Sequence, residues 1–182
     1  TARETLARLR TIVPHLATAG DLQQCDELVA AIDPIEDFAA SVKARTILAT
    51  FLLERREGEH SHNVARASSI YLELLQTDLR RTLPQAWEEA AIGLANCLIA
   101  EPNFPPEVYE AELKVLDRLA DLLRGGDPER LADALGAHAQ LLRSVRTGDR
   151  DENLARALAL QQDAITALGA SSRNVVRLVI GK

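Results

Sequence analysis

The chain has 182 residues, of which 47% are apolar, and it carries a net charge of −6. That content is enough for one domain with a substantial core or for one repeat array. The acidic balance and the 3% aromatic content disfavour nucleic acid as a partner. The sequence has no run of about eighteen apolar residues and no signal-peptide pattern, so we expect no membrane partner and a cytoplasmic location.

The first part of the chain predicts a leading hairpin over residues 1–33. Apolar residues at helical spacing predict a helix over 2–18, and Asp21 is placed to cap a second helix that ends at Ile32. Asp33-Pro34 then predicts the start of a long helix to about Arg56, with proline in the first turn.

Three two-helix repeats are predicted next, over 34–82, 83–125 and 126–169. Within them, a helix after Asn63 runs to about Arg81, Pro84 opens another, and Asp127-Pro128 combines a cap with a proline start. Ser171 or Ser172 is placed to cap a further helix in 170–182, although the β-branched residues there leave a strand open as an alternative.

The strongest sign of a repeat is a ten-residue segment that occurs twice. Residues 58–67 return ninety positions later as 148–157, and five of the ten residues match in type and place. Gly58 and Gly148 stand where a helix is expected to end, and Asn63 and Asn153 stand where the next is expected to begin. Self-similarity at a fixed period is typical of repeat architectures.

Small residues give the period of these repeats. In the first helix of each repeat they fall at Ala49, Ala95 and Ala139, with spacings of 46 and 44. In the second helix they are expected at Ala67, Ala111 and Ala157, with spacings of 44 and 46. A small residue in mid-helix lets a neighbouring helix approach closely, so the repeats are expected to stack and share one core.

The segment Trp87-x6-Leu94-Ala95-Asn96-Cys97-Leu98, with Pro84 before it, resembles the first helix of tetratricopeptide repeats. Thr147 to Ala157 resembles the long Gly-Asp-Arg-x-Glu-Asn-Leu connector of a bacterial variety that accompanies CHAT-type protease or NTPase modules. The resemblance covers residues 34 to 168. Trp87 lies eight residues before its small residue rather than the four usual in the family, and His138 stands where leucine is usual.

The resemblance implies a right-handed α-solenoid whose first helices line a concave, ligand-binding face. Partner contacts in this family come from set positions around the small residue. Carried over to this sequence, they are Lys43, Thr50, Leu53, Glu89, Asn96, Ile99, Asp133, Gln140 and Arg143. An alternative of equal weight is that these are merely solvated residues.

Other candidate sites have simpler explanations. His60 and His62 resemble a metal loop, but they occupy the places of Arg150 and Glu152 in the repeat, so we expect exposed connector residues. The residues Asp149, Asp151 and Asn153 imitate the opening of a calcium-binding loop but lack its later glycine and glutamate.

No catalytic constellation is evident. His138 lies on an apolar stripe, where a hydrogen-bonded core histidine is expected rather than a general base. Cys25 and Cys97 are expected to be buried thiols in a reducing compartment. We therefore expect no enzyme activity, no cofactor and no metal.

These observations predict an all-α fold, an α-solenoid of seven to nine helices in a single domain. Since residue 1 is Thr and the last residues run into an apolar segment, a piece of a longer bacterial protein is expected. Its predicted function is to scaffold or regulate by binding a peptide, a partner protein or another domain of its own chain. The alternative is a structural spacer or a self-association element that forms a homodimer.

Overall fold

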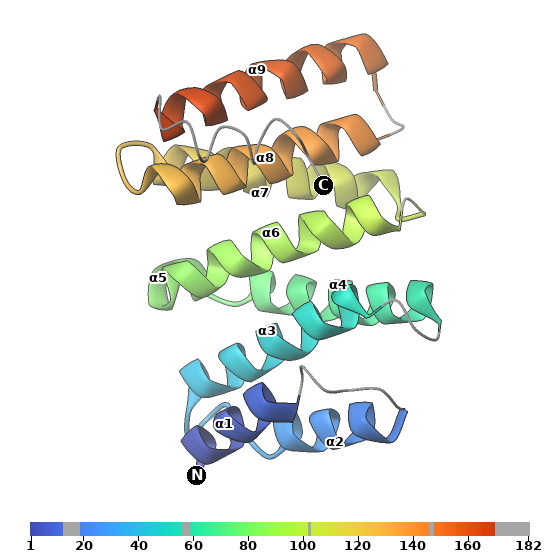
Figure 1. Cartoon of the computed structure of the whole chain (residues 1–182), viewed down its shortest axis with the longest axis vertical. Coiled ribbons are helices and arrows are strands. Elements are labelled where there is room, and N and C mark those ends of the chain that lie inside the picture. The colour runs from blue at the N-terminus through green and yellow to red at the C-terminus, as the bar shows by residue number, and fades with distance from the viewer. Residues whose placement is uncertain (13–18, 56–58, 102, 146–147, 170–182) are drawn as a thin grey trace. The chain divides into compact units, whose positions relative to one another are not determined.

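The computed structural model describes residues 1–12, 19–55, 59–101, 103–145 and 148–169. All the regular secondary structure within these ranges is helical, which confirms the predicted all-α class (Figure 1). The helices are α1 (Ala2–Ile12), α2 (Ala19–Ala30), α3 (Phe38–Glu54), α4 (His60–Gln76), α5 (Leu79–Thr82), α6 (Pro84–Ala100), α7 (Pro106–Leu123), α8 (Pro128–Ser144) and α9 (Arg150–Leu168).

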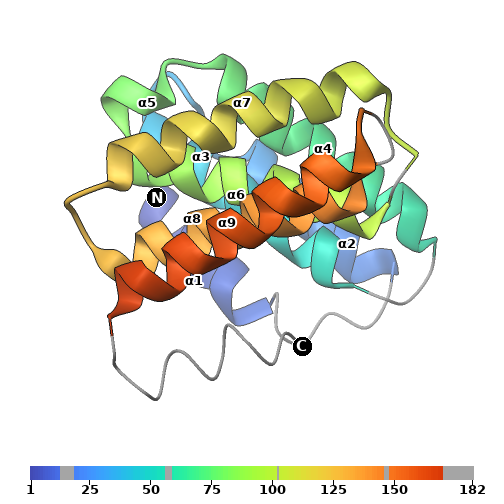
Figure 2. The same cartoon turned by 90° about the horizontal axis from the view of Figure 1, so that it is seen from above.

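The chain divides into two compact units, each described here by itself. Unit 1 is Thr1–Cys97 and unit 2 is Leu98–Lys182, so the division falls inside α6. In unit 1, α3 packs against α4 and also against α1 and α2. In unit 2, α8 packs against both α7 and α9, as Figures 1 and 2 show.

The prolines and caps of the later helices are where the sequence predicts them. α6 begins at Pro84 and α8 begins at Pro128. Asp127 caps α8 by accepting the Glu129 amide at 2.9 Å. Of the glycines expected at helix ends, Gly148 has a φ of +78°, while Gly58 lies outside the described residues.

The start of α3 was predicted wrongly. The helix begins at Phe38, because the Asp37 carboxylate accepts the Ala40 amide at 2.9 Å and serves as its cap. Asp33 instead accepts the Ile35 amide at 2.7 Å. A side chain bonding two residues ahead makes a local turn, and this turn replaces the predicted first turn of helix.

Both asparagines of the repeated segment were also placed wrongly. α4 begins at His60 and α9 begins at Arg150, so Asn63 and Asn153 are the fourth residues of their helices and do not cap them. Asp149 caps α9 by accepting two backbone amides of its first turn. α4 ends at Gln76, before the predicted end at Arg81, and the separate short helix α5 follows.

The structure describes the predicted leading hairpin only in part. The second helix begins at Ala19, two residues before Asp21, and ends at Ala30. Residues 13–18 of the predicted first helix and the helix predicted within 170–182 lie outside the described residues.

The small-residue spacing of the first helices is confirmed, since Ala49, Ala95 and Ala139 are all 0% exposed. α3, α6 and α8 each have 17 residues, so positions in them correspond at the same spacings of 46 and 44. We call positions related in this way register counterparts. Lys43 and Glu89, for example, are counterparts in α3 and α6.

For the second helices, the predicted spacing is wrong in the middle copy. Ala67 and Ala157 are buried, but Ala111 is exposed and its neighbour Glu112 is only 1% exposed. Glu112 lies 45 residues from each of the two buried alanines. The true register of α4, α7 and α9 is therefore 45 and 45, and a glutamate occupies the small-residue position of α7.

In unit 1, α6 approaches α4 closely at Gly93. A β-carbon at that position would lie 2.3 Å from Cζ of Tyr71, so only glycine fits against the ring. The Tyr71 hydroxyl shares a hydrogen bond with the Thr50 hydroxyl at 3.0 Å, and burial raises the Tyr71 pKa to about 12. This contact joins α3, α4 and α6.

The arginine of each copy of the repeated segment makes an equivalent ion pair. Arg66 on α4 reaches back to Asp26 on α2, with nitrogen–oxygen distances of 2.8 and 3.0 Å. Arg156 on α9 reaches back to Asp117 on α7 at 3.7 Å. The arginine therefore links consecutive second helices in both units.

Candidate functional site

An open groove lies in unit 1 between the first half of α3 and the start of α6. Its volume is about 450 Å³. It is lined by Ala39, Val42, Lys43, Thr46, Thr82, Leu83, Pro84, Gln85, Ala86 and Glu89. Its apolar lining is aliphatic, and the alanines leave room that larger side chains would fill.

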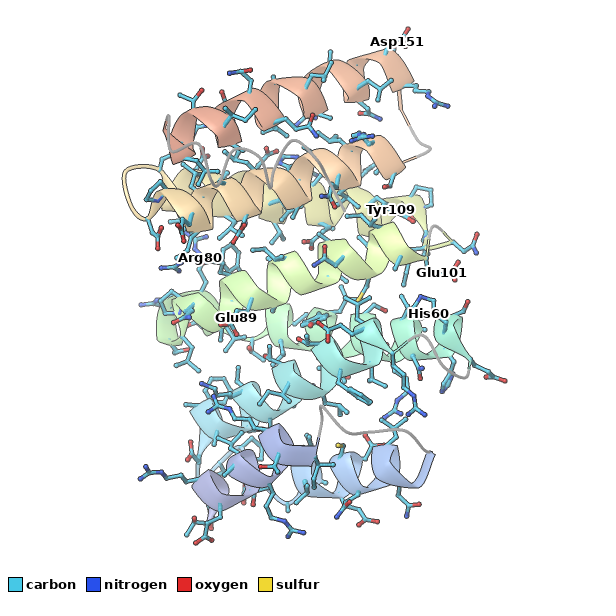
Figure 3. All side chains as sticks on the ribbon, viewed as in Figure 1. His60, Arg80, Glu89, Glu101, Tyr109 and Asp151 are labelled. Carbon is cyan, nitrogen blue, oxygen red and sulfur yellow. The ribbon has the colours of Figure 1, made fainter. Side chains whose placement is uncertain are left out.

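Two opposite charges line this groove, Lys43 from α3 and Glu89 from α6. Both side chains are exposed, and no ion pair joins them. Glu89, labelled on α6 in Figure 3, accepts a hydrogen bond from Gln85 at 3.4 Å. Lys43 makes no ion pair or hydrogen bond within the described residues. Each charge therefore remains accessible to a ligand.

Lys43 and Glu89 are the two predicted partner-binding residues that the structure brings into one groove. Thr50 is exposed, but its hydroxyl is engaged with Tyr71, which gives it a packing role. Leu53 is half-buried and Asn96 is exposed, and neither lines the groove.

The other four predicted residues belong to unit 2 and line no common cavity. Ile99 is half-buried and Asp133 is exposed. Gln140 lines a cavity of about 290 Å³ between α8 and α9. Arg143 lines a different cavity of about 420 Å³ where α8 gives way to α9. The nine residues thus do not form one site within either unit.

The sequence missed most of the groove's lining. Val42, Leu83 and Gln85 were not identified. For Leu83 and Gln85, the predicted helix to Arg81 hid the separate helix α5 and the junction between α5 and α6 at Leu83. Phe38 precedes Val42 by one helical turn on the same face of α3 and is 39% exposed. Phe38 itself does not line the groove.

His138 does not have the expected hydrogen-bonded environment. It is 0% exposed, and neither ring nitrogen has a hydrogen-bond partner. Its Nδ1 lies 3.6 Å from Asp117 on α7. The His138 pKa is lowered, and burial is the largest cause. The neighbouring Asp117 carboxylate raises this pKa, and the Arg156 guanidinium lowers it. None of the three cavities described above is lined by His138, so it has no route to a substrate through them.

Glu112 on α7 is a second buried polar side chain of unit 2. Neither carboxylate oxygen has a hydrogen-bond partner within the described residues. Burial raises the Glu112 pKa well above its ordinary value. Burial without a partner therefore favours the uncharged form of the Glu112 carboxyl group.

Metal-ligand types do not converge among the described residues: no group of three His, Cys, Asp or Glu side chains is placed to hold an ion. His60, at the amino end of α4 in Figure 3, instead bonds through Nδ1 to the Arg55 carbonyl oxygen at 3.2 Å. Cys25 and Cys97 are buried, as predicted.

Comparisons with protein-family models, curated proteins and solved structures returned no match. Among the described helices, none has the length and apolar character needed to cross a bilayer.

Proposed function

We propose that this chain is a non-catalytic protein-interaction module of the tetratricopeptide-like kind, which binds a peptide or partner domain in the groove between α3 and α6. The observation that carries the proposal is the pairing of an aliphatic lining with two accessible, opposite charges, Lys43 and Glu89. A volume of about 450 Å³ falls in the range of about 300–1,000 Å³ typical of binding pockets.

The lining also suggests how a peptide is oriented. An aliphatic side chain of the partner enters the space between Ala39 and Ala86. An acidic group on one side of it pairs with Lys43, and a basic group on the other side pairs with Glu89. Charges at the rim of an interface set orientation and association rate more than affinity, so the aliphatic contact supplies most of the binding energy.

A peptide array probed with the whole chain tests this proposal. We expect peptides in which an aliphatic residue lies between an acid and a base to bind. The variant Lys43→Glu is expected to lose these peptides and to favour peptides with two bases. The variant Lys114→Glu is the matched control, since Lys114 is exposed on α7 in unit 2. Binding that is equal in both variants would contradict the proposed site.

The setting within a larger bacterial, cytoplasmic protein is part of the same proposal. It is supported by the resemblance of Thr147–Ala157 to the connector of such proteins. In that setting, the partner is another domain of the same chain or a separate signalling protein. Pull-down with the parent protein, compared for Lys43→Glu and Lys114→Glu, distinguishes a specific partner from background capture.

Self-association is the second candidate function, and one observation favours it. Ile35 is 93% exposed and lies three residues before Phe38, the first residue of α3, which is 39% exposed, so two large apolar side chains are accessible at the start of this helix. Sedimentation at several concentrations tests this alternative. A mass that rises with concentration and returns to that of one chain in Ile35→Asp would support it, whereas a constant mass would exclude it.

A further inference from the structure

The cavity of about 420 Å³ in unit 2, where the end of α8 meets the start of α9, contains two arginines. Arg143 is in the last turn of α8, and Arg150 is the first residue of α9. Both side chains are exposed, and neither makes an ion pair or a hydrogen bond within the described residues. The remaining lining residues are Leu142, Ser144, Val145, Gly148, Asn153 and Leu154.

The charge of Arg150 is unfavourably placed when it has no partner. The amino end of a helix carries partial positive charge, so a cation is stabilising at the carboxyl end and not at the amino end. Arg143 follows this rule, but Arg150 does not. Arg150 also adds a second positive charge to the cavity that Arg143 lines. An anion bound in the cavity offsets both costs.

The acids near the start of α9 do not supply this anion. The Asp149 carboxylate accepts the amides of Asp151 and Glu152, at 2.8 and 3.2 Å. None of these three acids lines the cavity, and Figure 3 shows Asp151 pointing away from α8. Because Asp149 already occupies two amides of the first turn, the donors in the cavity are the arginine side chains and not the end of the helix.

The first copy of the repeated segment lacks both arginines. Ninety positions earlier, Arg143 and Arg150 correspond to Leu53 and His60. His60 bonds through Nδ1 to the Arg55 carbonyl oxygen at 3.2 Å, so its ring is engaged within the chain. Since α3 and α4 pack together without the two arginines, the repeat itself does not require them.

The two charges define the anion. A guanidinium group presents its N–H donors in a planar fork that matches phosphate oxygens. A phosphate monoester carries a charge of about −1.5 to −2 at neutral pH, which balances two arginines, whereas one carboxylate balances only one. A cavity of about 420 Å³ is in the range of small-molecule sites and has room for more than the phosphate group.

The rest of the lining defines the organic part of the ligand. Val145 and Leu154 give an aliphatic wall, and no aromatic side chain lines the cavity to stack on a nucleobase. The Ser144 hydroxyl donates to the Gln140 carbonyl oxygen at 3.0 Å, so its own oxygen remains able to accept a hydrogen bond. This lining suits a small, non-aromatic ligand with hydroxyl groups.

We propose that this cavity binds a small sugar phosphate, with the phosphate held by Arg143 and Arg150. The sugar lies against Leu154, and one of its hydroxyl groups donates to Ser144. The ligand thereby joins the end of α8 to the start of α9. The site is separate from the groove beside Lys43 and Glu89, and it does not rest on the peptide binding proposed there.

Calorimetric titration of the whole chain with ribose 5-phosphate at low ionic strength tests this proposal. We expect Arg150→Gln to weaken binding about tenfold or more, because it removes charge-assisted hydrogen bonds. Arg143→Leu/Arg150→His, which copies the first repeat, is expected to abolish binding. Arg118→Gln is the matched control, because Arg118 is an exposed arginine of α7 that does not line the cavity.

Equal affinity of Arg150→Gln and Arg118→Gln for ribose 5-phosphate would overturn the proposal, as would no binding by the unaltered chain. Inorganic phosphate and a phosphoserine peptide distinguish other sources of the phosphate group. We expect both to bind more weakly than ribose 5-phosphate. Equal affinity for inorganic phosphate would indicate an adventitious ion only, and tighter binding of the peptide would indicate a protein ligand. Either result would overturn the proposal.

Amide chemical shifts of the unaltered chain locate the ligand without any substitution. Ribose 5-phosphate is expected to shift the amides of Ser144, Val145 and residues 148–154. The amides of residues 59–64, at the corresponding place in unit 1, are expected not to shift. Shifts of equal size in both segments, or shifts confined to other parts of the chain, would overturn the proposal.

Discussion

Units 1 and 2 bury chemically different side chains at corresponding positions of the sequence repeat. Leu48 in unit 1 and His138 in unit 2 are counterparts, and both are buried. Ala67 on α4 and Glu112 on α7 are counterparts as well, and both are buried. The repeat register therefore fixes which positions are enclosed, even where the enclosed side chain carries an ionisable group.

The difference has an energetic consequence. Burying an unpaired polar group costs about 1–3 kcal/mol by the measure of protein mutations. Unit 2 bears this cost at Glu112 and at His138, since none of their side-chain polar atoms has a hydrogen-bond partner. At the same positions unit 1 has only aliphatic side chains. We therefore expect unit 2 to be the less stable of the two and the more sensitive to pH.

The largest effect is expected from a substitution that breaks the close contact between Gly93 on α6 and Tyr71 on α4 in unit 1. The change Gly93→Ala puts a β-carbon 2.3 Å from Cζ of Tyr71. The ring is 2% exposed and bonded to Thr50, so it has no room to withdraw. We expect a loss of roughly 1–3 kcal/mol despite the better helix propensity of alanine, measured by hydrogen exchange in α3 and α4.

The counterparts in unit 2 supply a matched rescue for this variant. Tyr71 corresponds to Leu116 and Gly93 corresponds to Ala137. The double variant Gly93→Ala/Tyr71→Leu thus copies the pair from unit 2. We expect it to be more stable than Gly93→Ala alone. If the two substitutions were simply additive, the ring would not be the cause.

The second prediction concerns a variant in which Glu112, the buried acid of unit 2, is replaced by methionine. Glu112→Met keeps the side-chain length and is expected to stabilise unit 2 by roughly 1–3 kcal/mol at neutral pH, because it removes an unpaired buried group. The raised pKa means that the folded chain holds a proton that the unfolded chain releases. Stability therefore falls as pH rises from the ordinary value of 4.5 to the raised value.

Denaturant unfolding across pH measures this effect. Glu112→Met should flatten the decline above pH 4.5, while the control Glu110→Met, at an exposed position of α7, should retain it. A decline of equal size in both variants would mean that another group carries it.

The third prediction concerns the opposite side of the pH range. Burial lowers the His138 pKa from its ordinary 6.5, so the unfolded chain takes up a proton before the folded chain does. The stability lost as pH falls below 6.5 should be absent in His138→Leu, which copies Leu48. We expect a gain of about 1–2 kcal/mol at pH 5, where the difference is measured by denaturant unfolding. The reverse change, Leu48→His, should create the same acid sensitivity in unit 1.

The spacing of small residues and the positions of prolines made much of the fold predictable from the sequence. Ala49, Ala95 and Ala139 were identified as buried small residues, and Pro84 and Pro128 were identified as helix starts, because these features depend on local chemistry. Glu112 could not be identified, since nothing local distinguishes a buried glutamate from the exposed acids around it. The small residue next to it, Ala111, was predicted to be the buried one.

The groove was less predictable than the fold. Lys43 and Glu89 were found through their fixed distance from the small residue. Leu83 and Gln85 were missed because their position depends on where α4 ends and α5 begins. Thr77, directly after α4, donates its hydroxyl to the Leu74 carbonyl at 2.7 Å. This capping contact at the end of the helix leaves no signal in the hydrophobic spacing.

The smallest expected effect compares the two arginines of the repeated segment. Arg66 holds Asp26 through two short hydrogen bonds, whereas Arg156 lies 3.7 Å from an Asp117 that also faces His138. Both pairs are partly exposed, so each alanine variant is expected to cost about 0.2–1 kcal/mol, with Arg66→Ala the more costly. Double-mutant cycles with Asp26→Ala and Asp117→Ala, measured at low and high salt, separate pairing from packing. If Asp117 is shared with His138, the Arg156 coupling should weaken further below pH 6.5, while the Arg66 coupling should not change there.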